Sequence, residues 1–370
     1  MSRLNLLYLL KNDNLVLREI PLYSKRMIPI PKYHQSLLSW YGLYQRQLPW
    51  RSLPGQVPDP YHVWVSEIML QQTTVQTVKE YYLNFLKKWP KIENLANAPL
   101  DDVFHMWQGL GYYRRARNLH KCAQMIHQEY KDTFPSEEKA LLSLPGIGPY
   151  TAAAILSIAF NKPATVVDGN IERVMARLFQ IETPLPKAKK EIQEKAASLT
   201  FQDSPGDYAQ ALMDLGSSIC TPKSPACSMC PIHNFCQAFK KNPEDFPRRA
   251  PKKIKPTRYG TFFWIENDKG DVLIEKRPDK GLLAGMMGFP TSSWKEIQEQ
   301  NSRPEVRLID EESLEKGVRH TFTHFHLIGE VIIAKSRDTD GLWVSPKNLN
   351  NYALPTLMKK IRNAVQEVRQ

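Results

Sequence analysis

LPGIGPYTAAAIL, residues 144–156, is the stretch that decides how this chain folds. The letters before it, SEEKALLSL, have helical character, and PYTAAAILSIAF continues as a second helix with three adjacent alanines. Gly146 and Gly148 therefore stand in a short turn between two helices. Glycine lets a backbone approach a phosphate closely, and the next helix offers unpaired N–H groups and its positive dipole end. We predict that this turn binds a phosphate group. An ordinary turn between two packed helices is the alternative.

Outside this turn, the spacing of apolar residues divides the chain into regions. From residue 33 to residue 239 the period is helical, as in VWVSEIMLQQTTVQTVKEYYLNFLKKW and NIERVMARLFQI, and convincing strands are few. After residue 258 the pattern changes to strands, with YGTFFWIE and DVLIEKRP flanking the turn NDKG, then the β stretch GVRHTFTHFHLIGEVIIAK and a closing helix, PTLMKKIRNAVQEVR. We predict an N-terminal extension at 1–32, an all-α domain at 33–219, a cysteine loop at 220–239, a basic linker at 240–257 and an α+β domain at 258–370.

The charge of the chain favours a polyanionic partner. The sequence has 370 residues, a formal net charge of +12 and 28 prolines. An excess of this size favours nucleic acid or an acidic membrane surface. Residues 240–258 hold four of the prolines and eight basic residues against two acids, so we expect an exposed, semi-extended linker that lies along phosphates or is simply solvated.

The N-terminal segment carries no chemistry of its own. No apolar run approaches the roughly 20 residues that span a bilayer. MSRLNLLYLLKNDN is a weak mimic of a signal peptide, and we interpret residues 1–26 as a tail or an upstream start.

Four of the five cysteines stand together in CTPKSPACSMCPIHNFC. Their spacing is C-x6-C-x2-C-x5-C, whereas Cys122 is alone in a helical stretch, where we expect a small buried apolar side chain. Two disulfides are the weaker interpretation in a chain of this size without an export signal. A metal site is favoured, and both zinc and a 4Fe–4S cluster accept four thiolates. The four candidate ligands are Cys220, Cys227, Cys230 and Cys236.

Two acids are candidates for catalysis. Glu67 in VWVSEIMLQQTT falls within an apolar helical stripe, where poor solvation would raise its pKa and keep it protonated near neutral pH. Asp168 in VVDGNIERV precedes a helix, where an ordinary N-cap is the alternative. An acid that donates a proton and an ionised acid that stabilises a positive sugar are what glycosidic bond cleavage requires. On DNA, the target would be an N-glycosidic bond of a flipped nucleotide.

The motifs together resemble a known family. DPYHVWVSEIMLQQT, GLGYYRRARNLH, LPGIGPYTA, VDGNIERV and the cysteine loop follow in this order. The chain is similar to the helix–hairpin–helix glycosylases with an iron–sulfur cluster, and among them to MutY-type adenine DNA glycosylases. The resemblance implies an all-α glycosylase core, a 4Fe–4S cofactor and a Nudix-like C-terminal domain. It also implies base excision repair of adenine opposite 8-oxoguanine or guanine in duplex DNA, by a monomer in the cytoplasm of a bacterium, with the nucleoid.

The resemblance also implies roles for single residues. Glu67 would protonate adenine at N7 and then help to activate water, and Asp168 with Asn170 would stabilise the oxocarbenium ion. Bifunctional relatives of the endonuclease III type carry a lysine where this chain has Tyr150, which cannot form an imine. Tyr150 therefore implies a monofunctional enzyme, in which it shapes the site and helps Asp168. Residues matching positions that face the base or probe the stack are Arg46, Trp50, Arg51, Gln71, Tyr112 and Gln210, and Lys223 would hold the DNA backbone.

The C-terminal domain resembles the Nudix-like domain with which such enzymes recognise 8-oxoguanine. A nucleotide-hydrolysing site would need an R-E-x-x-E-E helix, and TSSWKEIQEQ lacks it, so we expect no hydrolysis there. Phe322, Thr323 and His324 match the family loop written Phe-Ser-His. By alternation, His320, Phe322, His324 and His326 would share one strand face, and simple packing or a weak metal cluster is the alternative.

Two other functions compete with this interpretation. One is a glycosylase and lyase of the endonuclease III type, against which Tyr150 and the C-terminal domain argue. The other is a DNA-binding or mispair-sensing protein without catalysis, against which the presence of both acids argues.

Overall fold

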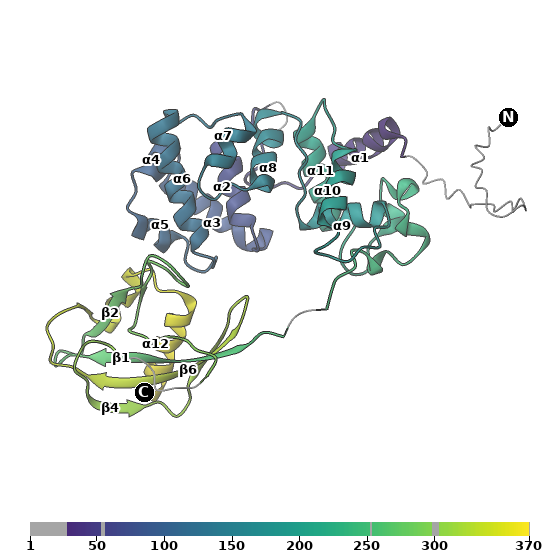
Figure 1. The fold of residues 1–370 in the computed structure, drawn as a ribbon. Coiled ribbons are helices and arrows are strands. Elements are labelled where there is room, and N and C mark those ends of the chain that lie inside the picture. Colours follow the sequence, from purple (N-terminus) through teal and green to yellow (C-terminus); the bar gives the residue numbers. More distant parts are fainter. Residues whose placement is uncertain (1–27, 53–55, 252–253, 298–302, 370) are drawn as a thin grey trace, which may run out of the picture.

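A computed structural model describes residues 28–52, 56–251, 254–297 and 303–369, so the N-terminal stretch interpreted as a tail lies outside the described residues. The chain forms a helical part and, beside it, a part built on a β-sheet (Figure 1). None of the described helices combines the length and the apolar character needed to cross a membrane. The helices of the first part are α1 (Ile30–Tyr44), α2 (Pro60–Leu70), α3 (Val75–Lys88), α4 (Ile92–Ala96), α5 (Leu100–Met106), α6 (Arg114–Tyr130), α7 (Glu138–Ser143), α8 (Pro149–Phe160), α9 (Gly169–Leu178), α10 (Lys189–Ala197) and α11 (Pro205–Ser218).

Helix α8 joins two hydrophobic cores. Its side chains Ala152 and Ile155 belong to the core built around α2 to α6, while Ala153 and Ala154 belong to the core built around α1, α9, α10 and α11. Alanine lets neighbouring helices approach closely, since its side chain is small, and α8 contacts both α2 and α11. The alanine run of the opening stretch therefore brings the two halves of the helical part together.

The turn before α8 has the expected geometry. It connects α7 to α8, with Gly146 at φ +81° and Ile147 buried beneath it. A Cβ atom on Gly146 would lie 2.8 Å from the Cβ of Asn118, whereas Gly148 faces open space. Glycine is thus required at position 146 by conformation and packing, and position 148 leaves the backbone accessible.

The stretch after the cysteine loop differs in part from the expected exposed linker. The loop has three short 3₁₀ turns (Cys227–Met229, His233–Phe235 and Ala238–Lys240), and a fourth follows at Pro243–Asp245. Phe246 is only 2% exposed in the second core, and the backbone N–H of Leu185 donates to the carbonyl of Arg248 at 2.8 Å. Arg248 also pairs with Glu182. An aromatic side chain and this ion pair fasten residues 246–250 to the helical part, so the expectation of a fully exposed linker was wrong there.

The C-terminal part is a mixed sheet covered by a helix. Its strands are β1 (Thr257–Glu266), β2 (Val272–Lys276), β3 (Met287–Gly288), β4 (Ile309–Ser313), β5 (Val318–Thr321), β6 (His326–Lys335) and β7 (Leu342–Val344), followed by a 3₁₀ turn (Pro346–Asn351) and α12 (Thr356–Val368). The main strand order is β3-β2-β1-β6-β4; β1 and β6 are parallel, and β5 and β7 pair with β6 and β2. The predicted β1–β2 hairpin is confirmed. The predicted closing helix is α12, and it packs on the sheet through Leu357, Met358, Ile361 and Val365.

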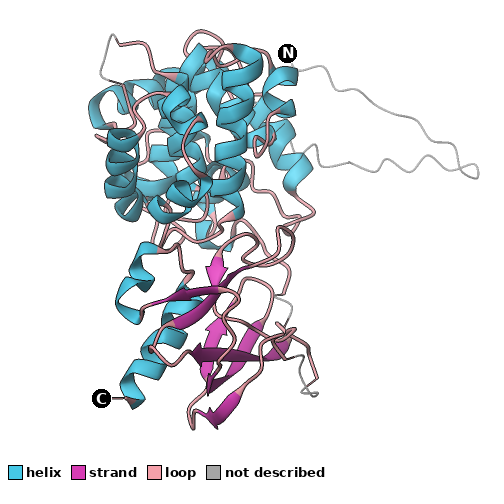
Figure 2. Cartoon of the chain, turned by 90° about the vertical axis from the view of Figure 1, so that its left-hand side faces the viewer, coloured by secondary structure: helices cyan, strands magenta, loops and turns pink. Residues whose placement is uncertain are grey.

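The helical part and the sheet part lie against each other (Figure 2), and they contact each other through α5, α6 and loops of the C-terminal part. Arg117 of α6 donates to the carbonyl oxygens of Asp279, at 2.8 Å, and Ala284. Lys359 of α12 donates to the side-chain oxygen of Gln108 at 2.6 Å. Met286 is buried in the helical core that α2 to α6 build. The sheet domain is therefore held against the helical domain by both polar and apolar contacts.

Candidate active site

A hollow between α2, α11 and the segment after α1 brings several predicted residues together. It has about 420 Å³ of empty space, part of it open to solvent. Glu67, Arg46, Trp50, Arg51 and Gln210 all line it. The other lining residues are mostly apolar: Leu48, Val63, Ser66, Leu70, Val75, Ile158 and Met213. An apolar hollow with a few convergent polar groups is typical of a site for a small planar group such as a base.

Glu67 is the buried acid of this hollow. It lies on α2 and is 5% exposed, because the surrounding helix faces are apolar, as its place in the stripe predicted. The hydroxyl of Tyr150 donates to its Oε2 at 2.5 Å. Burial raises the pKa of Glu67 to about 7; the Tyr150 hydrogen bond lowers it, Asp168 raises it and Arg51 lowers it. A carboxyl with this pKa can hold a proton near neutral pH and give it up to a bound group.

Tyr150 stands in the first turn of α8, directly after the glycine turn. Its hydroxyl group bonds to Glu67. Burial raises the pKa of Tyr150 well above its ordinary value, and the nearby charges of Glu67 and Asp168 raise it further, so the hydroxyl is a proton donor. Tyr150 therefore makes its direct contact with Glu67. It interacts with Asp168, which it was expected to help, through the nearby charge.

Asp168 caps α9. Its Oδ1 accepts the backbone N–H groups of Asn170, at 3.0 Å, and Ile171, at 2.7 Å, and its Oδ2 accepts the Asn170 side-chain amide at 2.9 Å. Burial raises the pKa of Asp168, against these hydrogen bonds and the charge of Arg173, which lower it. The N-cap interpretation is thus structurally correct. It does not compete with the catalytic one, because the same donors stabilise a carboxylate facing Tyr150 and Glu67.

Sequence reasoning missed Asp214, which organises the arginines of the site. Its Oδ1 and Oδ2 accept from Arg51 at 2.6 and 2.7 Å, and its Oδ1 accepts from Arg46 Nε at 2.6 Å. Both arginines line the hollow, but their charged groups are paired with this acid. Asp214 follows Gln210 by one helical turn on α11, and that spacing was the available signal.

Of the other residues predicted to contact the base or the stack, Trp50 and Gln210 line the hollow and Gln71 does not. Trp50 lines the hollow and packs edge-on against Tyr82, with ring centroids 5.6 Å apart. Gln210 also lines it, and its amide donates to the Gly206 carbonyl at 3.3 Å. Gln71 follows the end of α2, and its side chain lies 3.5 Å from the Thr151 hydroxyl. Gln71 is therefore placed beside the first turn of α8, while the other two residues form part of the wall of the hollow.

Tyr112 lies outside the hollow, where the two parts of the chain meet. It is 48% exposed at φ +48°, and its hydroxyl is 2.9 Å from that of Thr323. Arg115 stabilises the neighbouring backbone by donating to the carbonyls of Gln71, at 2.6 Å, and Leu110, at 3.1 Å. The two residues expected to probe the stack, Gln71 and Tyr112, are thus connected through one guanidinium group.

The loop expected to recognise the oxidised base is not part of one continuous strand. Strand β5 ends at Thr321 and β6 begins at His326, so the intervening residues form a turn. Phe322 packs against Trp294 at a centroid distance of 5.7 Å, while Thr323 and His324 are exposed. The expectation that four alternating residues share a strand face was wrong, because the turn interrupts the alternation.

Part of the segment tested for a Nudix motif can also be described. Residues 291–297 are not helical, and the rest of TSSWKEIQEQ, residues 298–300, lies outside the described residues.

The four cysteines of the loop fit an iron–sulfur cluster. All four are free thiols, and Cys220, Cys230 and Cys236 pack against the second core. Burial raises the pKa of Cys230, and the charges of Cys220, Cys236 and Cys227 raise it further, so the four sulfur atoms lie near one another. Arg177 of α9 donates to Cys220 Sγ at 3.2 Å. Among the described residues, the four cysteines included, no three His, Cys, Asp or Glu side chains converge on a single metal ion.

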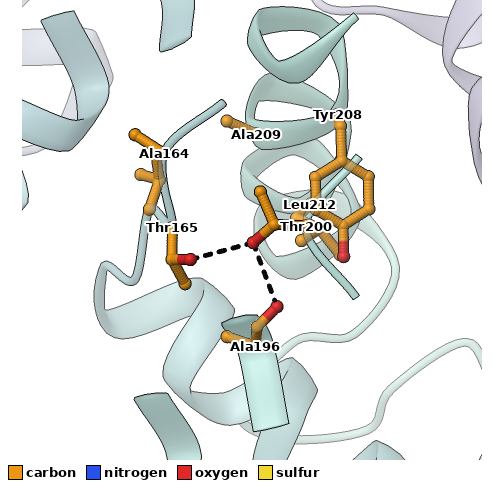
Figure 3. Close-up of a pocket in the computed structure, with 8 residues that line it drawn as sticks. Ala164, Thr165, Ala196, Thr200, Tyr208, Ala209 and Leu212 are labelled. Carbon is orange, nitrogen blue, oxygen red and sulfur yellow. Dashed lines mark hydrogen bonds between the residues drawn. The ribbon is translucent and has the colours of Figure 1, made fainter. Parts of the chain in front are cut away.

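Lys223, Cys122 and a second hollow lie away from the hollow that contains Glu67. Lys223 is exposed in the loop, and its carbonyl accepts from the Thr221 hydroxyl at 2.9 Å. Cys122 is a buried apolar residue of α6, as expected. A second hollow lies between residues 164–166 and α11 (Figure 3). There Thr165 and Thr200 bond to each other at 2.9 Å, so its polar groups are already paired.

Comparisons with known proteins match the helical part, the cysteine loop and the sheet part of the chain. Residues 65–200 match the HhH-GPD superfamily base excision DNA repair proteins, residues 220–236 match the iron–sulfur binding domain of endonuclease III, and residues 261–364 match the NUDIX domain. An adenine DNA glycosylase of Buchnera aphidicola is 33% identical over 90% of this chain and 97% of that protein. The adenine DNA glycosylase of Homo sapiens is 32% identical over 91% of this chain and 74% of that protein.

A solved structure agrees with the helical part. The structure of a thermostable thymine-DNA glycosylase is 30% identical, with a TM-score of 0.51, over 57% of this chain and 97% of that chain.

Proposed function

The chain belongs to the adenine DNA glycosylase family, and on that premise we propose that its substrate is adenine mispaired with 8-oxoguanine or guanine in duplex DNA. It is a base excision repair enzyme that hydrolyses N-glycosyl bonds. The observation that supports our assignment of the chemistry is the hollow with Glu67 at its wall. A buried carboxyl with a pKa of about 7 lies there beside two arginines and a tryptophan.

In the proposed reaction, Glu67 gives its proton to N7 of the flipped adenine. The proton makes adenine a better leaving group, and the positive charge moves to the sugar as the bond breaks. Asp168, held by the backbone N–H groups at the start of α9, stabilises this oxocarbenium ion, with Asn170 holding the carboxylate. Glu67, now ionised, accepts a proton from the attacking water. Arg46, Trp50, Arg51 and Gln210 surround the base.

The hydroxyl of Tyr150 supports a monofunctional enzyme. A lyase step requires an amine that attacks the sugar and forms an imine. Tyr150 supplies a hydroxyl group instead, and that group is bonded to Glu67. We therefore propose hydrolysis to an abasic site without efficient strand cleavage.

The remaining residues would hold the DNA and read the opposite base. Gly146 and Gly148 would approach a phosphate at the start of α8, and Lys223 would contact the backbone from the cysteine loop. Gln71 and Tyr112 would probe the stack. Phe322, Thr323 and His324 would contact the 8-oxoguanine, which is supported by the 2.9 Å contact between the hydroxyls of Tyr112 and Thr323. We propose a monomer acting on the nucleoid in the cytoplasm of a bacterium.

The cysteine loop binds a 4Fe–4S cluster. Cys220, Cys227, Cys230 and Cys236 would each supply one thiolate. A cluster held in this way would fix the loop and its basic side chains, while the acids of the hollow carry out hydrolysis.

The experiment that tests this function is single-turnover cleavage of duplexes carrying adenine opposite 8-oxoguanine, guanine or thymine, with and without alkali. We expect strand breaks only after alkali, fastest opposite 8-oxoguanine. Breaks without alkali on oxidised pyrimidines would instead support a lyase of the endonuclease III type. If no duplex released a base, only the non-catalytic binding protein would remain.

A further inference from the structure

Asp214 does not line the hollow itself, but it binds two positive side chains that do. It is 0% exposed and lies on α11, one turn after Gln210. Its Oδ2 accepts the backbone N–H of Arg46 at 2.9 Å, and its two oxygens accept from the guanidinium groups of Arg46 and Arg51 at 2.6 to 2.7 Å. One buried carboxylate therefore sets the position of both arginines that line the hollow.

The charges of Asp214, Arg46 and Arg51 do not cancel fully. Two guanidinium groups face one carboxylate, and the side chains of Arg51 and Arg46 are 9% and 30% exposed. Burial acts to raise the pKa of Asp214, but the hydrogen bonds and charge of Arg51, together with Arg46, outweigh it and bring the pKa below its ordinary value. The other titratable groups that interact with Arg51 are Tyr41, Glu67 and Asp207. Asp214 is thus the ionised acid that limits the positive charge of the hollow.

The positive sign of the charge on Arg46 and Arg51 matters for the reaction. Adenine is uncharged when it binds, so guanidinium groups can donate hydrogen bonds to it without penalty. Positive charge appears on the base when N7 is protonated, and it moves to the sugar as the bond breaks. Nearby arginines without a compensating carboxylate would oppose that charge, because electrostatic effects are strong in a site that excludes water.

We propose that Asp214 is a positioning residue that holds Arg46 and Arg51 as directed hydrogen-bond donors for the base and shields the positive transition state from their charge. This role rests on the proposed function of the hollow and of Glu67. It also explains how two arginines can lie beside an acid that must keep its proton, since Arg51 acts to lower the pKa of Glu67.

The test compares single-turnover adenine release by the wild type, Asp214→Asn, Arg46→Gln and the double variant. Asparagine has nearly the same shape as aspartate, so Asp214→Asn removes a charge with little change in volume. We expect Asp214→Asn to slow release by about 10²-fold. Adding Arg46→Gln to it should raise the rate above that of Asp214→Asn, because the second change removes an uncompensated positive charge. If the double variant is slower than Asp214→Asn, the shielding role is wrong.

Two further variants separate shielding from structural support. Asp203→Asn removes a carboxylate from the exposed segment just before the same helix, and its rate should stay close to that of the wild type. Asp214→Glu keeps the charge at the buried position, and it remains informative if Asp214→Asn does not fold. We expect Asp214→Glu to keep the pH midpoint of release found for the wild type while its rate falls, because the arginines shift. A midpoint moved in Asp214→Glu would contradict the proposal.

The pH profile supplies a readout that a structural role would not change. In Asp214→Asn, the uncompensated Arg51 should favour ionised Glu67, so the pH at which activity is lost should move to lower values. An unmoved midpoint would contradict the proposal. Failure of the function itself looks different, because then the wild type releases no adenine from any duplex, or Glu67→Gln releases it at the normal rate.

Discussion

The proton on Glu67 is the most consequential property of a single residue in this chain. The carboxyl group lies among apolar side chains of α2, where water cannot solvate a charge, and burial is the main reason that its pKa rises to about 7. The Tyr150 hydroxyl, at 2.5 Å, limits this rise because it stabilises the ionised form. These opposing effects leave the carboxyl able to donate a proton and to take one back at nearly the same pH.

This environment predicts the pH dependence of base release. The pKa of Glu67 rises from 4.5 to about 7, so the group is protonated below about pH 7 and ionised above it. Because the reaction needs the proton, the single-turnover rate should fall as the pH rises through about 7. Rates measured with adenine opposite 8-oxoguanine from pH 5 to pH 9 check this.

Glu67→Gln is the matched control, since it keeps the shape and removes the titration. It should bind the lesion duplex and lose about 10² to 10⁴ in rate, with no change in the residual rate near pH 7. If Glu67→Gln keeps the wild-type rate, Glu67 is not the general acid.

At the level of single elements, the two glycines of the turn between α7 and α8 have different roles. Gly146 has a left-handed backbone conformation and no space for a Cβ atom, whereas Gly148 has an ordinary conformation and open space around it. The first glycine therefore serves the fold, and the second leaves the start of α8 open to a ligand.

A pair of alanine substitutions tests this division. Gly146→Ala should lower the free energy of unfolding by about 1 to 3 kcal/mol, because it imposes a strained conformation and a contact with Asn118. Gly148→Ala should leave stability nearly unchanged and weaken binding to duplex DNA, because a methyl group then faces the phosphate. Chemical unfolding and a duplex-binding titration measure the two effects. Equal loss of stability in both variants would contradict the distinction.

The cysteine loop is the element that binds the iron–sulfur cluster. We expect the purified protein to be brown, with broad absorbance near about 400 nm from iron–thiolate charge transfer. Cys230→Ser should lower the iron content and the absorbance together, since it removes one of the four thiolates. Iron and zinc analysis checks this expectation. A colourless wild-type protein with one equivalent of zinc would contradict it.

At the scale of the whole molecule, the helical domain and the sheet domain form one contact around Tyr112. Arg117 and Gln108 bond to the sheet domain beside it, and Met286 of the sheet domain is buried among the helices. This contact brings Thr323 to Tyr112, the residue proposed to probe the stack. We therefore propose that recognition of the oxidised base at Thr323 affects Tyr112 at the edge of the glycosylase domain through this contact.

The net charge of the molecule predicts how it binds DNA. With a formal charge of +12, binding should rely on phosphate contacts and the release of counterions. The affinity of Glu67→Gln for a lesion duplex should fall by about 10³-fold between 50 and 200 mM salt if about six phosphates are neutralised. Lys223→Ala should reduce the slope of log affinity against log salt by about 1. A flat titration would count against the proposed DNA surface.

The sequence by itself determined the features that depend on local spacing. The helical period, the glycine turn before α8, the β1–β2 hairpin and the cysteine spacing each involve neighbours in the chain, so their residues alone indicated the elements. The burial of Glu67 was also predictable, because an acid in an apolar helical stripe faces the core. The alternation around Thr323 was misleading, since a turn residue and a strand residue can have the same pattern.

Only the tertiary structure decided which side chains meet. Tyr150 bonds to Glu67 across 83 positions of the chain, and Arg46 bonds to Asp214 across 168. The spacing of Asp214 from Gln210 indicates a shared helix face, but it does not show that Asp214 is buried and ion-paired. The basic stretch after the cysteine loop likewise does not show that Phe246 is buried. These outcomes depend on how helices far apart in sequence pack together, because burial and long-range charge pairs are properties of the assembled core.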